Sequence, residues 1–382
     1  MTYRCRRQAL TKQGANLGKV ATTRPEPIEW DSEETAPESI RLFERHPAEE
    51  PIAFEYYRAQ FGLQQIVYSY LSRTLGLTTL AQLQTIPAIL TALVLAGLFF
   101  TYLQLYNRLF AVLFLLSLAC APYFLSMARN LYWNPYLMLA PALAAAFLYQ
   151  ARTRTGQGLL LGLIGLLMML KCLSSYEYLT SVTLLACSVL LVAPMFGDPE
   201  ARPRWKLAAA VFAVCVVGFV AAFLIHASVR GDTLLAGIRN IYVEDIARRT
   251  FGDPNSFAGE TGESLRASVW DVLKIYFFEY PGRRTMIVPG KVFLGLFALS
   301  IAGIGYKFLT RHPLARRDAY TFVVFLLVPL SWFILAKGHS FTQTHINFVL
   351  WYVGFMPALL FVAWSAVASG LAAIMNRRNQ AF

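Results

Sequence analysis

Titratable side chains gather in three short segments that separate strongly apolar stretches of the chain. They are Lys337, His339 and His345 in KGHSFTQTHIN, Arg129 in MARNLYWNPY, and Lys171 and Glu177 in LKCLSSYEYLTS. Ionisable residues at membrane depth cost about 2.5–3.5 kcal/mol each, so a set on one side of a membrane indicates a shared cavity. Arginine presents a planar fork that matches phosphate, and lysine supplies a point charge. The cations and histidines of these segments therefore predict a site for a phosphate group.

Each of these residues also has an ordinary structural interpretation. Arg129 and Lys337 can extend their apolar stems along lipid while their charges reach water. Trp133 fits the aromatic belt that membrane proteins place at the lipid–water interface. Glu177 is harder to explain in this way, because a lone acid beside a membrane usually has a partner. Lys171 or Arg129 would supply that partner.

The sequence does not favour metal or redox chemistry. His339 and His345 are six residues apart, and no third ligand lies nearby. Four of the five cysteines fall in or at the ends of apolar stretches, without a CxxC pair, so we expect free thiols that pack as small apolar groups. We predict no cofactor, with a divalent cation as the weaker alternative.

The composition predicts that membrane-spanning helices position these segments. The chain is 57% hydrophobic and 15% charged, with a mean hydropathy of +0.48, whereas soluble domains carry about 25% charged residues. A spanning helix needs about 20 apolar residues, and by that rule we expect an all-α polytopic protein with about nine spans. The predicted spans are 86–105, 109–128, 131–149, 158–172, 178–196, 206–228, 292–309, 319–336 and 348–375.

The distribution of basic residues predicts the orientation of these spans. The loops after the first, third, fifth and seventh spans and the C-terminal tail hold twelve Lys and Arg residues, against three in the loops after the second, fourth and eighth. Short cytoplasmic loops collect Lys and Arg, so we expect a cytoplasmic C-terminus, and the three titratable segments face outward. The net charge of +12 is spread over these loops, and we predict no nucleic-acid partner.

The chain divides into five parts by composition. Residues 1–50 are polar and expected to be largely disordered, 51–84 to form interfacial amphipathic helices, 85–228 the first six spans, 229–290 a long outer loop or small subdomain, and 291–382 the last three spans. This orientation puts residues 1–84 outside, although they carry no secretion signal. We expect either a further span upstream of Met1 or a helix before residue 86 that lies in the interface.

Together these features resemble the GT-C membrane glycosyltransferases, which include the protein O-mannosyltransferases. The resemblance implies a hexosyltransferase that moves a sugar from a polyprenyl phosphate to a glycan, lipid or protein acceptor on the outer face of a bacterial inner membrane. It also implies a carboxylate base in the first outer loop. The stretch AFEYYRAQFG (53–62) points to Glu55 as that base, with Glu50 and Glu177 as further catalytic candidates. Arg129, Lys171, Lys337, His339 and His345 would neutralise the leaving phosphate.

Two other classes of protein compete with this interpretation. A flippase or transporter for lipid-linked saccharides usually shows internal repeats and polar residues near the bilayer midplane, and neither is evident here. A polysaccharide polymerase or ligase would use the 229–290 loop, where Arg248, Arg249 and Arg266 would bind pyrophosphate. Those arginines would alternatively pair with the nearby acids Glu244, Asp245 and Asp253.

Overall fold

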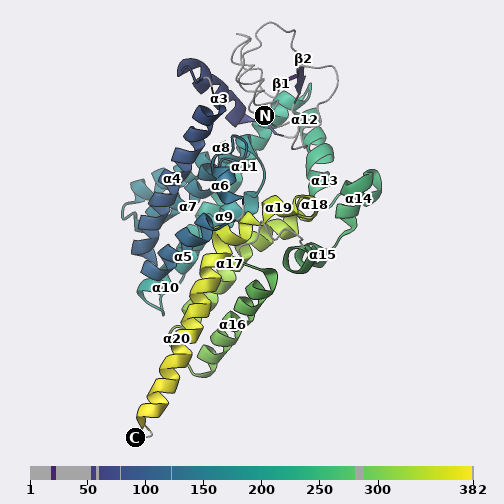
Figure 1. The fold of residues 1–382 in the computed structure, drawn as a ribbon. Helices are drawn as coiled ribbons and strands as arrows, with labels where there is room; N and C mark the ends of the chain where they lie inside the picture. The colour runs from purple at the N-terminus through teal and green to yellow at the C-terminus, as the bar shows by residue number, and fades with distance from the viewer. Residues whose placement is uncertain are drawn as a thin grey trace.

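The fold is a bundle of apolar helices with a cluster of short helices at one end (Figure 1). The computed structural model describes residues 19–22, 53–56, 60–77, 79–121, 123–279 and 288–380. Within these ranges seven helices are long and apolar enough to cross a membrane. They are α4 (Leu80–Leu105), α8 (Arg154–Ser174), α9 (Leu179–Val192) with α10 (Pro194–Gly197), α11 (Trp205–Arg230), α16 (Gly290–Leu309), α17 (Ala315–Leu335), and η4 (Trp351–Phe355) with α20 (Met356–Gln380).

Two of the nine predicted spans form shorter apolar helices, α5 (Arg108–Ala119) and α7 (Pro135–Gln150). The predicted span 109–128 is interrupted, because α5 ends at Ala119 and α6 (Phe124–Ala128) follows as a separate helix. The predicted span 131–149 starts late, because Asn134 adopts a left-handed conformation and Pro135 begins the helix. The 16 residues of α7 reach about 24 Å, which is less than the hydrocarbon thickness of about 30 Å.

The connections between helices lie at two ends of the bundle. One end, named the site end below, contains α3 (Leu63–Thr74), α6, the helices of residues 231–279, α18 (Lys337–Thr342) and α19 (Thr344–Asn347). The 231–279 segment folds into α12 (Leu234–Ile241), η1 (Tyr242–Ile246), α13 (Ala247–Arg249), η2 (Pro254–Ser256), α14 (Gly259–Arg266), α15 (Val269–Lys274) and η3 (Ile275–Glu279). The region predicted as a long outer loop or small subdomain is therefore mostly helical where the structure describes it.

The N-terminal part contributes one small strand pair. β1 (Lys19–Thr22) and β2 (Ala53–Tyr56) are antiparallel, with Val20 opposite Glu55. The predicted disorder of residues 1–50 otherwise lies outside the described residues. Helix α3 follows, and the glutamines that interrupt its apolar pattern, Gln64 and Gln65, are buried against the protein.

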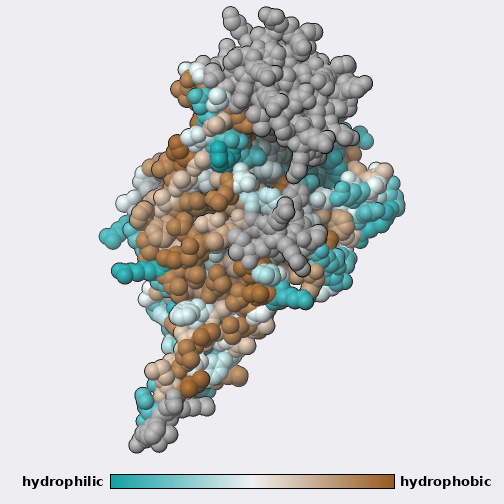
Figure 2. All heavy atoms as spheres, in the orientation of Figure 1, coloured by the Kyte–Doolittle hydropathy of each residue, from teal (hydrophilic) through white to brown (hydrophobic). Residues whose placement is uncertain are grey.

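Close contacts between small residues hold the bundle together. A Cβ atom on Gly218 of α11 would lie 2.3 Å from the carbonyl oxygen of Gly165 on α8, so only glycine allows these two helices to cross here. Small residues let helices approach in this way where lipid supplies no hydrophobic driving force. Among the seven spans, the one formed by α9 and α10 is the most enclosed, with 72% of its most apolar stretch buried inside the protein. On the visible face in Figure 2, apolar side chains cover the bundle, and polar ones gather over α14 and α15.

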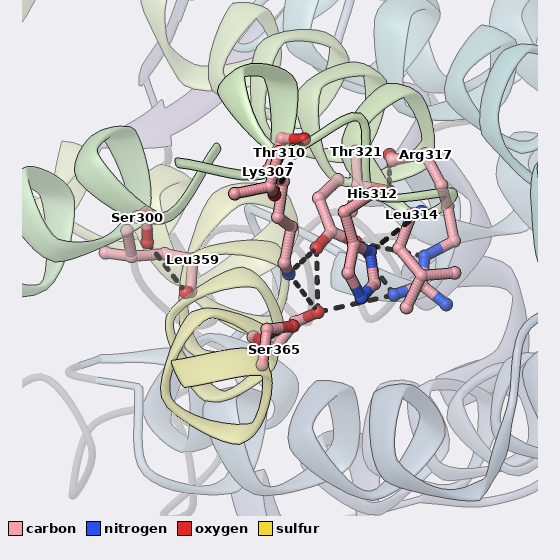
Figure 3. Close-up of polar contacts among 11 residues, drawn as sticks. Ser300, Lys307, Thr310, His312, Leu314, Arg317, Thr321, Leu359 and Ser365 are labelled. Carbon is pink, nitrogen blue, oxygen red and sulfur yellow. Dashed lines mark hydrogen bonds and ion pairs between the residues drawn. The ribbon is translucent and has the colours of Figure 1, made fainter. Parts of the chain in front are cut away.

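A buried ionic network ties α16, α17 and α20 at the opposite end of the bundle (Figure 3). Asp318 is fully buried and accepts hydrogen bonds from Lys307, Arg317 and Ser365. Lys307 Nζ also donates to Ser365 Oγ at 2.7 Å. Charges buried this deeply require partners, and the network supplies them.

Candidate active site

A cavity of about 1050 Å³ opens at the site end. Its walls come from segments far apart in the sequence, namely residues 130–133, Glu177, α13, α14 and the α18–α19 hairpin. The acidic and basic residues that line it are Glu177, Arg248, Arg249, Glu260 and His339. The predicted gathering of Glu177 and His339 in one hollow is therefore what the structure shows.

Strained backbone turns position two walls of the cavity. Tyr178, directly after Glu177, precedes α9 with a φ of 63°, and Asn134 precedes α7 with a φ of 47°. A left-handed conformation costs a residue with a side chain about 1–2 kcal/mol. Tyr68 on α3 holds Asn134 through a 2.8 Å hydrogen bond from its hydroxyl group to Oδ1. Strain of this kind persists only where the surrounding structure imposes it, and it concentrates at functional sites.

The Glu177 carboxylate is almost fully buried and surrounded by donors. Trp133 Nε1 donates to Oε2 at 2.8 Å, and the Tyr132 hydroxyl group donates to Oε1 at 3.4 Å. His339 Nε2 lies 3.6 Å from the same Oε1. Burial disfavours the ionised form, but interactions with His339, then Arg249 and Lys171, outweigh it and lower the pKa of Glu177 to about 2. Glu177 is therefore ionised at neutral pH and is a weak base.

Lys171 fixes the backbone beneath Glu177. Its ammonium group is buried and donates to the carbonyl oxygens of Ser175, at 2.6 Å, and of Glu177. The predicted proximity of Lys171 to Glu177 is present, but the contact is to the main chain. Because these carbonyls occupy the ammonium group and Lys171 does not line the cavity, the structure does not favour its predicted role in binding phosphate.

His339 is held in one orientation by Asn347. The fully buried amide nitrogen of Asn347 lies 3.3 Å from His339 Nδ1 and 3.4 Å from the His339 carbonyl oxygen. Because an amide nitrogen only donates, Nδ1 accepts, and the ring proton lies on Nε2. That nitrogen faces Glu177. Trp332 packs edge-on against the imidazole, with ring centroids 5.7 Å apart.

Two consecutive arginines enter the cavity from α13. Arg248 lies 3.9 Å from Asp245, which is more closely bound by Arg230 at the end of α11. Arg249 makes no hydrogen bond or ion pair with any described residue, although it lines the cavity. The predicted pairing of these arginines with nearby acids thus holds weakly for Arg248 and not for Arg249, whose guanidinium group is available to a ligand.

Glycine at position 338 brings α13, α14 and α18 together. A Cβ atom there would lie 3.2 Å from the Arg248 carbonyl oxygen, 3.3 Å from that of Arg249 and 3.3 Å from Ser264 Oγ. A larger residue would push these elements apart. Gly338 therefore sets the distance between Arg249 and the next residue along α18, His339.

The remaining predicted site residues lie elsewhere. Lys337 donates to the carbonyl oxygens of Leu265 and Ala267, at 2.7 Å each, and so fastens α14 to α18 instead of facing the cavity. Arg129 is exposed and is not part of the lining. His345 lies in α19, but its side chain is outside the described part of the structure, as is that of Glu55 in β2. Glu50 lies wholly outside the described residues.

A smaller, apolar cavity of about 170 Å³ adjoins the first. Phe219 and Phe223 of α11 and Leu335 of α17 line it, and it shares Glu177, Arg249 and His339 with the large cavity. An apolar hollow thus meets a polar one at the imidazole N–H of His339 and at the Arg249 guanidinium group, which pairs with no described residue. This arrangement can hold an amphiphile whose apolar part fills one cavity and whose anionic group reaches the other.

Three residues that line or support the cavities had no predicted role in the site, or only a secondary one. They are Arg249, Glu260 and Asn347. Arg249 was predicted to pair with neighbouring acids, and nothing in its spacing shows that Arg230 takes Asp245 instead. Glu260 lies in the short segment GETGE, which carries no recognisable pattern. Asn347 ends the segment that holds His339, and its position there was the one available signal.

The family model for Glucosyl transferase GtrII matches residues 63–358. This match includes every residue that lines the two cavities. No curated protein and no solved structure matches the chain.

Proposed function

We propose that the chain, which belongs to the GtrII glucosyl transferase family, is a membrane glucosyltransferase that uses a polyprenyl-phosphate-linked donor. In this proposal it transfers the glucosyl group to a hydroxyl group of a glycan, lipid or protein on the outer face of the membrane. The observation that carries the proposal is the meeting of an apolar and a polar cavity at Glu177, Arg249 and His339. A lipid-linked sugar phosphate has the same order of apolar, anionic and polar parts.

The donor would lie across the boundary between the two cavities. Its first isoprene units would contact Phe219 and Phe223, which burial against apolar side chains favours. Its phosphate would accept hydrogen bonds from the Arg249 guanidinium group and from His339 Nε2, because that nitrogen lies 3.6 Å from Glu177 Oε1, too far for a hydrogen bond between them. The glucosyl group would then project into the large cavity, where the acceptor also binds.

The reaction breaks the bond between the anomeric carbon and the phosphate oxygen, and both electrons leave with the phosphate. The acceptor oxygen forms the new bond to the anomeric carbon and gives its proton to a base. Arg249 and His339 would stabilise the charge that develops on the leaving phosphate, which is usually the dominant catalytic effect. Glu177 would act by orienting the His339 ring.

We assign Glu260 on α14 as the base that takes the proton from the acceptor hydroxyl group. Glu177 is a poorer choice, because donors surround both of its oxygens and its pKa is lowered to about 2. Glu260 lines the same cavity, is exposed, and has no hydrogen bond or ion pair with any described residue. Glu55 remains the alternative that the resemblance favours.

Among the three acceptor classes the lining favours a glycan. Besides its charges, the large cavity presents the aromatic rings of Tyr132 and Trp133 and the neutral polar side chains of Asn130, Thr261 and Gln343. A sugar ring offers an apolar face to aromatic side chains and hydroxyl groups to polar ones.

The test is transfer of labelled glucose from polyprenyl-phosphate-glucose to a glycan acceptor in vesicles that contain the purified chain. We expect Arg249→Gln to lower the rate about 100-fold, because a lost charge-assisted contact to phosphate is worth about 3 kcal/mol. Arg266→Gln is the control, since Arg266 is exposed and does not line the cavity. Equal rates for the two variants, or movement of intact donor across the bilayer without transfer, would overturn the proposal.

The base is tested separately by Glu260→Gln, with Glu263→Gln on the same helix as control. Glu263 is also exposed but does not line the cavity. We expect loss of transfer for Glu260→Gln alone. If Glu55→Gln abolishes transfer and Glu260→Gln does not, the base lies in the first outer segment.

A further inference from the structure

Helix α12 carries an apolar stripe that no described residue covers. Leu234 is 47% exposed, Leu235 76% and Tyr242, at the start of η1, 60%. Leu234, Ile238 and Tyr242 are spaced four residues apart, so they lie along one side of the helix, with Leu235 beside them. This stripe belongs to neither cavity.

Two other sides of α12 pack against or bond to α11. Gly237 and Ile241 are buried, and a Cβ atom on Gly237 would lie 1.9 Å from the carbonyl oxygen of Ala227 on α11. On the polar side, Asn240 accepts a 2.6 Å hydrogen bond from Arg230 Nε. The helix is therefore fixed to the end of α11, and its exposed large apolar side chains lie along the stripe.

The length of α11 sets the depth of α12 in the membrane. Helix α11 has 26 residues and reaches about 39 Å, which exceeds the hydrocarbon core of about 30 Å. It begins with Trp205 and Lys206, residue types that mark an interface. Counting about 20 residues for the hydrocarbon core from there ends it near residue 225, just before the contact between Ala227 and Gly237. Helix α12 thus lies at the level of the lipid headgroups.

We propose that α12 is a membrane-surface helix whose apolar stripe inserts between the lipids of the leaflet at the site end. Amphipathic helices bind in this way, with the apolar side in the boundary between headgroups and acyl chains. The occupant of the stripe is lipid, because α11 carries α12 to this depth and α12 presents its unburied apolar side there.

This docking has a consequence for the arginine of the candidate site. Helix α12 continues without a break through η1 into α13, which ends at Arg249. A helix anchored among headgroups therefore holds the Arg249 guanidinium group close to the depth of a lipid phosphate. This second step rests on the proposed function, whereas the position of α12 in the membrane does not.

Fluorescence quenching in lipid nanodiscs tests the docking. Leu235→Cys is labelled with a bimane dye in a chain whose Cys5 and Cys120 are replaced by serine. Ala236→Cys is the matched control, because Ala236 is exposed but lies about 100° further round the helix. Tyr242→Cys repeats the measurement on the stripe in case the first variant folds poorly.

We expect lipids with a nitroxide near the headgroup to quench the label at Leu235→Cys several-fold more than at Ala236→Cys. Iodide in the water should show the reverse order. Strong iodide quenching at Leu235→Cys would mean that the stripe faces water. Quenching by neither agent would mean that another part of this chain or a second copy covers it, and either result overturns the proposal.

A kinetic measurement tests the link to Arg249. Leu234→Ser combined with Leu235→Ser should raise the KM for the polyprenyl-phosphate donor several-fold and leave kcat little changed, since the cavities keep their residues. An unchanged KM would refute the link. If lipid quenches the label at Leu235→Cys as expected but no sugar is transferred, the proposed function is rejected and the docking of α12 stands. If sugar is transferred but the label is exposed to water, the docking is rejected and the proposed function stands.

Discussion

Replacing Glu177 with glutamine tests how the centre of the site is held together. Glutamine keeps the shape of the side chain and an oxygen that can accept the hydrogen bond from Trp133 Nε1. It removes the negative charge that faces His339, Arg249 and Lys171. The variant therefore separates the charge of Glu177 from its packing.

The size of the effect follows from the lowered pKa. The pKa of Glu177 falls from 4.5 to about 2 in the folded protein, and this difference corresponds to about 3 kcal/mol of stabilisation at neutral pH. Because the folded-state pKa is the lower one, the stabilisation is present above pH 4.5 and is lost as the pH falls toward 2. The stability difference between wild type and Glu177→Gln should narrow from about 3 to about 1.5 kcal/mol between pH 7 and pH 3.

The assay is unfolding of both proteins in mixed micelles by titration with SDS, at several pH values. Glu260→Gln is the control, since that carboxylate has no hydrogen bond or ion pair with any described residue, and its stability at pH 7 should match that of wild type. Combining Glu177→Gln with His339→Gln should destabilise less than the sum of the single changes. A Glu177→Gln variant that is as stable as wild type, or equally destabilised at every pH, would refute the reasoning.

Three further variants test other parts of the structure. Asp318→Asn should destabilise the protein by about 3–5 kcal/mol, because it leaves Lys307 buried without its counter-charge; an unfolding titration that shows less than 1 kcal/mol would contradict this. Gly338→Ala should lower transfer at least several-fold with little loss of stability, as the new Cβ presses on the carbonyl of Arg249; normal kinetics would show that the spacing is unimportant. Lys337→Met should lower the free energy of unfolding by about 2–3 kcal/mol, because it leaves the carbonyl oxygens of Leu265 and Ala267 without their donor. Protease cleavage between α14 and α15 should increase, and unchanged cleavage would count against the contact.

Much of the helical framework could be predicted from apolar segments alone. Length and composition locate α4, α8, α11, α16 and α17 to within a few residues, because a helix in lipid must be apolar over its whole span. The same rule overestimates the helix length in segments 109–128 and 131–149. Their breaks arise from backbone conformation at Tyr123 and Asn134, which hydropathy does not register.

The candidate site was predicted only in part. Glu177 and His339 were expected to share a hollow because ionisable residues gather on one side of the membrane, but the partner predicted for Glu177 was Lys171 or Arg129. The structure instead places His339 Nε2 3.6 Å from Glu177 Oε1. Arg249 was given a pyrophosphate-binding role only in the competing polymerase or ligase interpretation, with pairing to nearby acids such as Asp245 as the alternative. The acid in question pairs with Arg230, 15 residues earlier, a tertiary choice that local spacing does not reveal.

The central claim is that the two cavities form one binding site for a lipid-linked sugar phosphate. Photo-crosslinking tests it most directly, with a polyprenyl-phosphate-glucose analogue that carries a diazirine on its first isoprene unit. We expect crosslinks to the peptide of α11 that contains Phe219 and Phe223, and we expect their loss in Arg249→Gln, where the phosphate is no longer held. Crosslinks confined to other helices, or the same yield in Arg249→Gln, would contradict it.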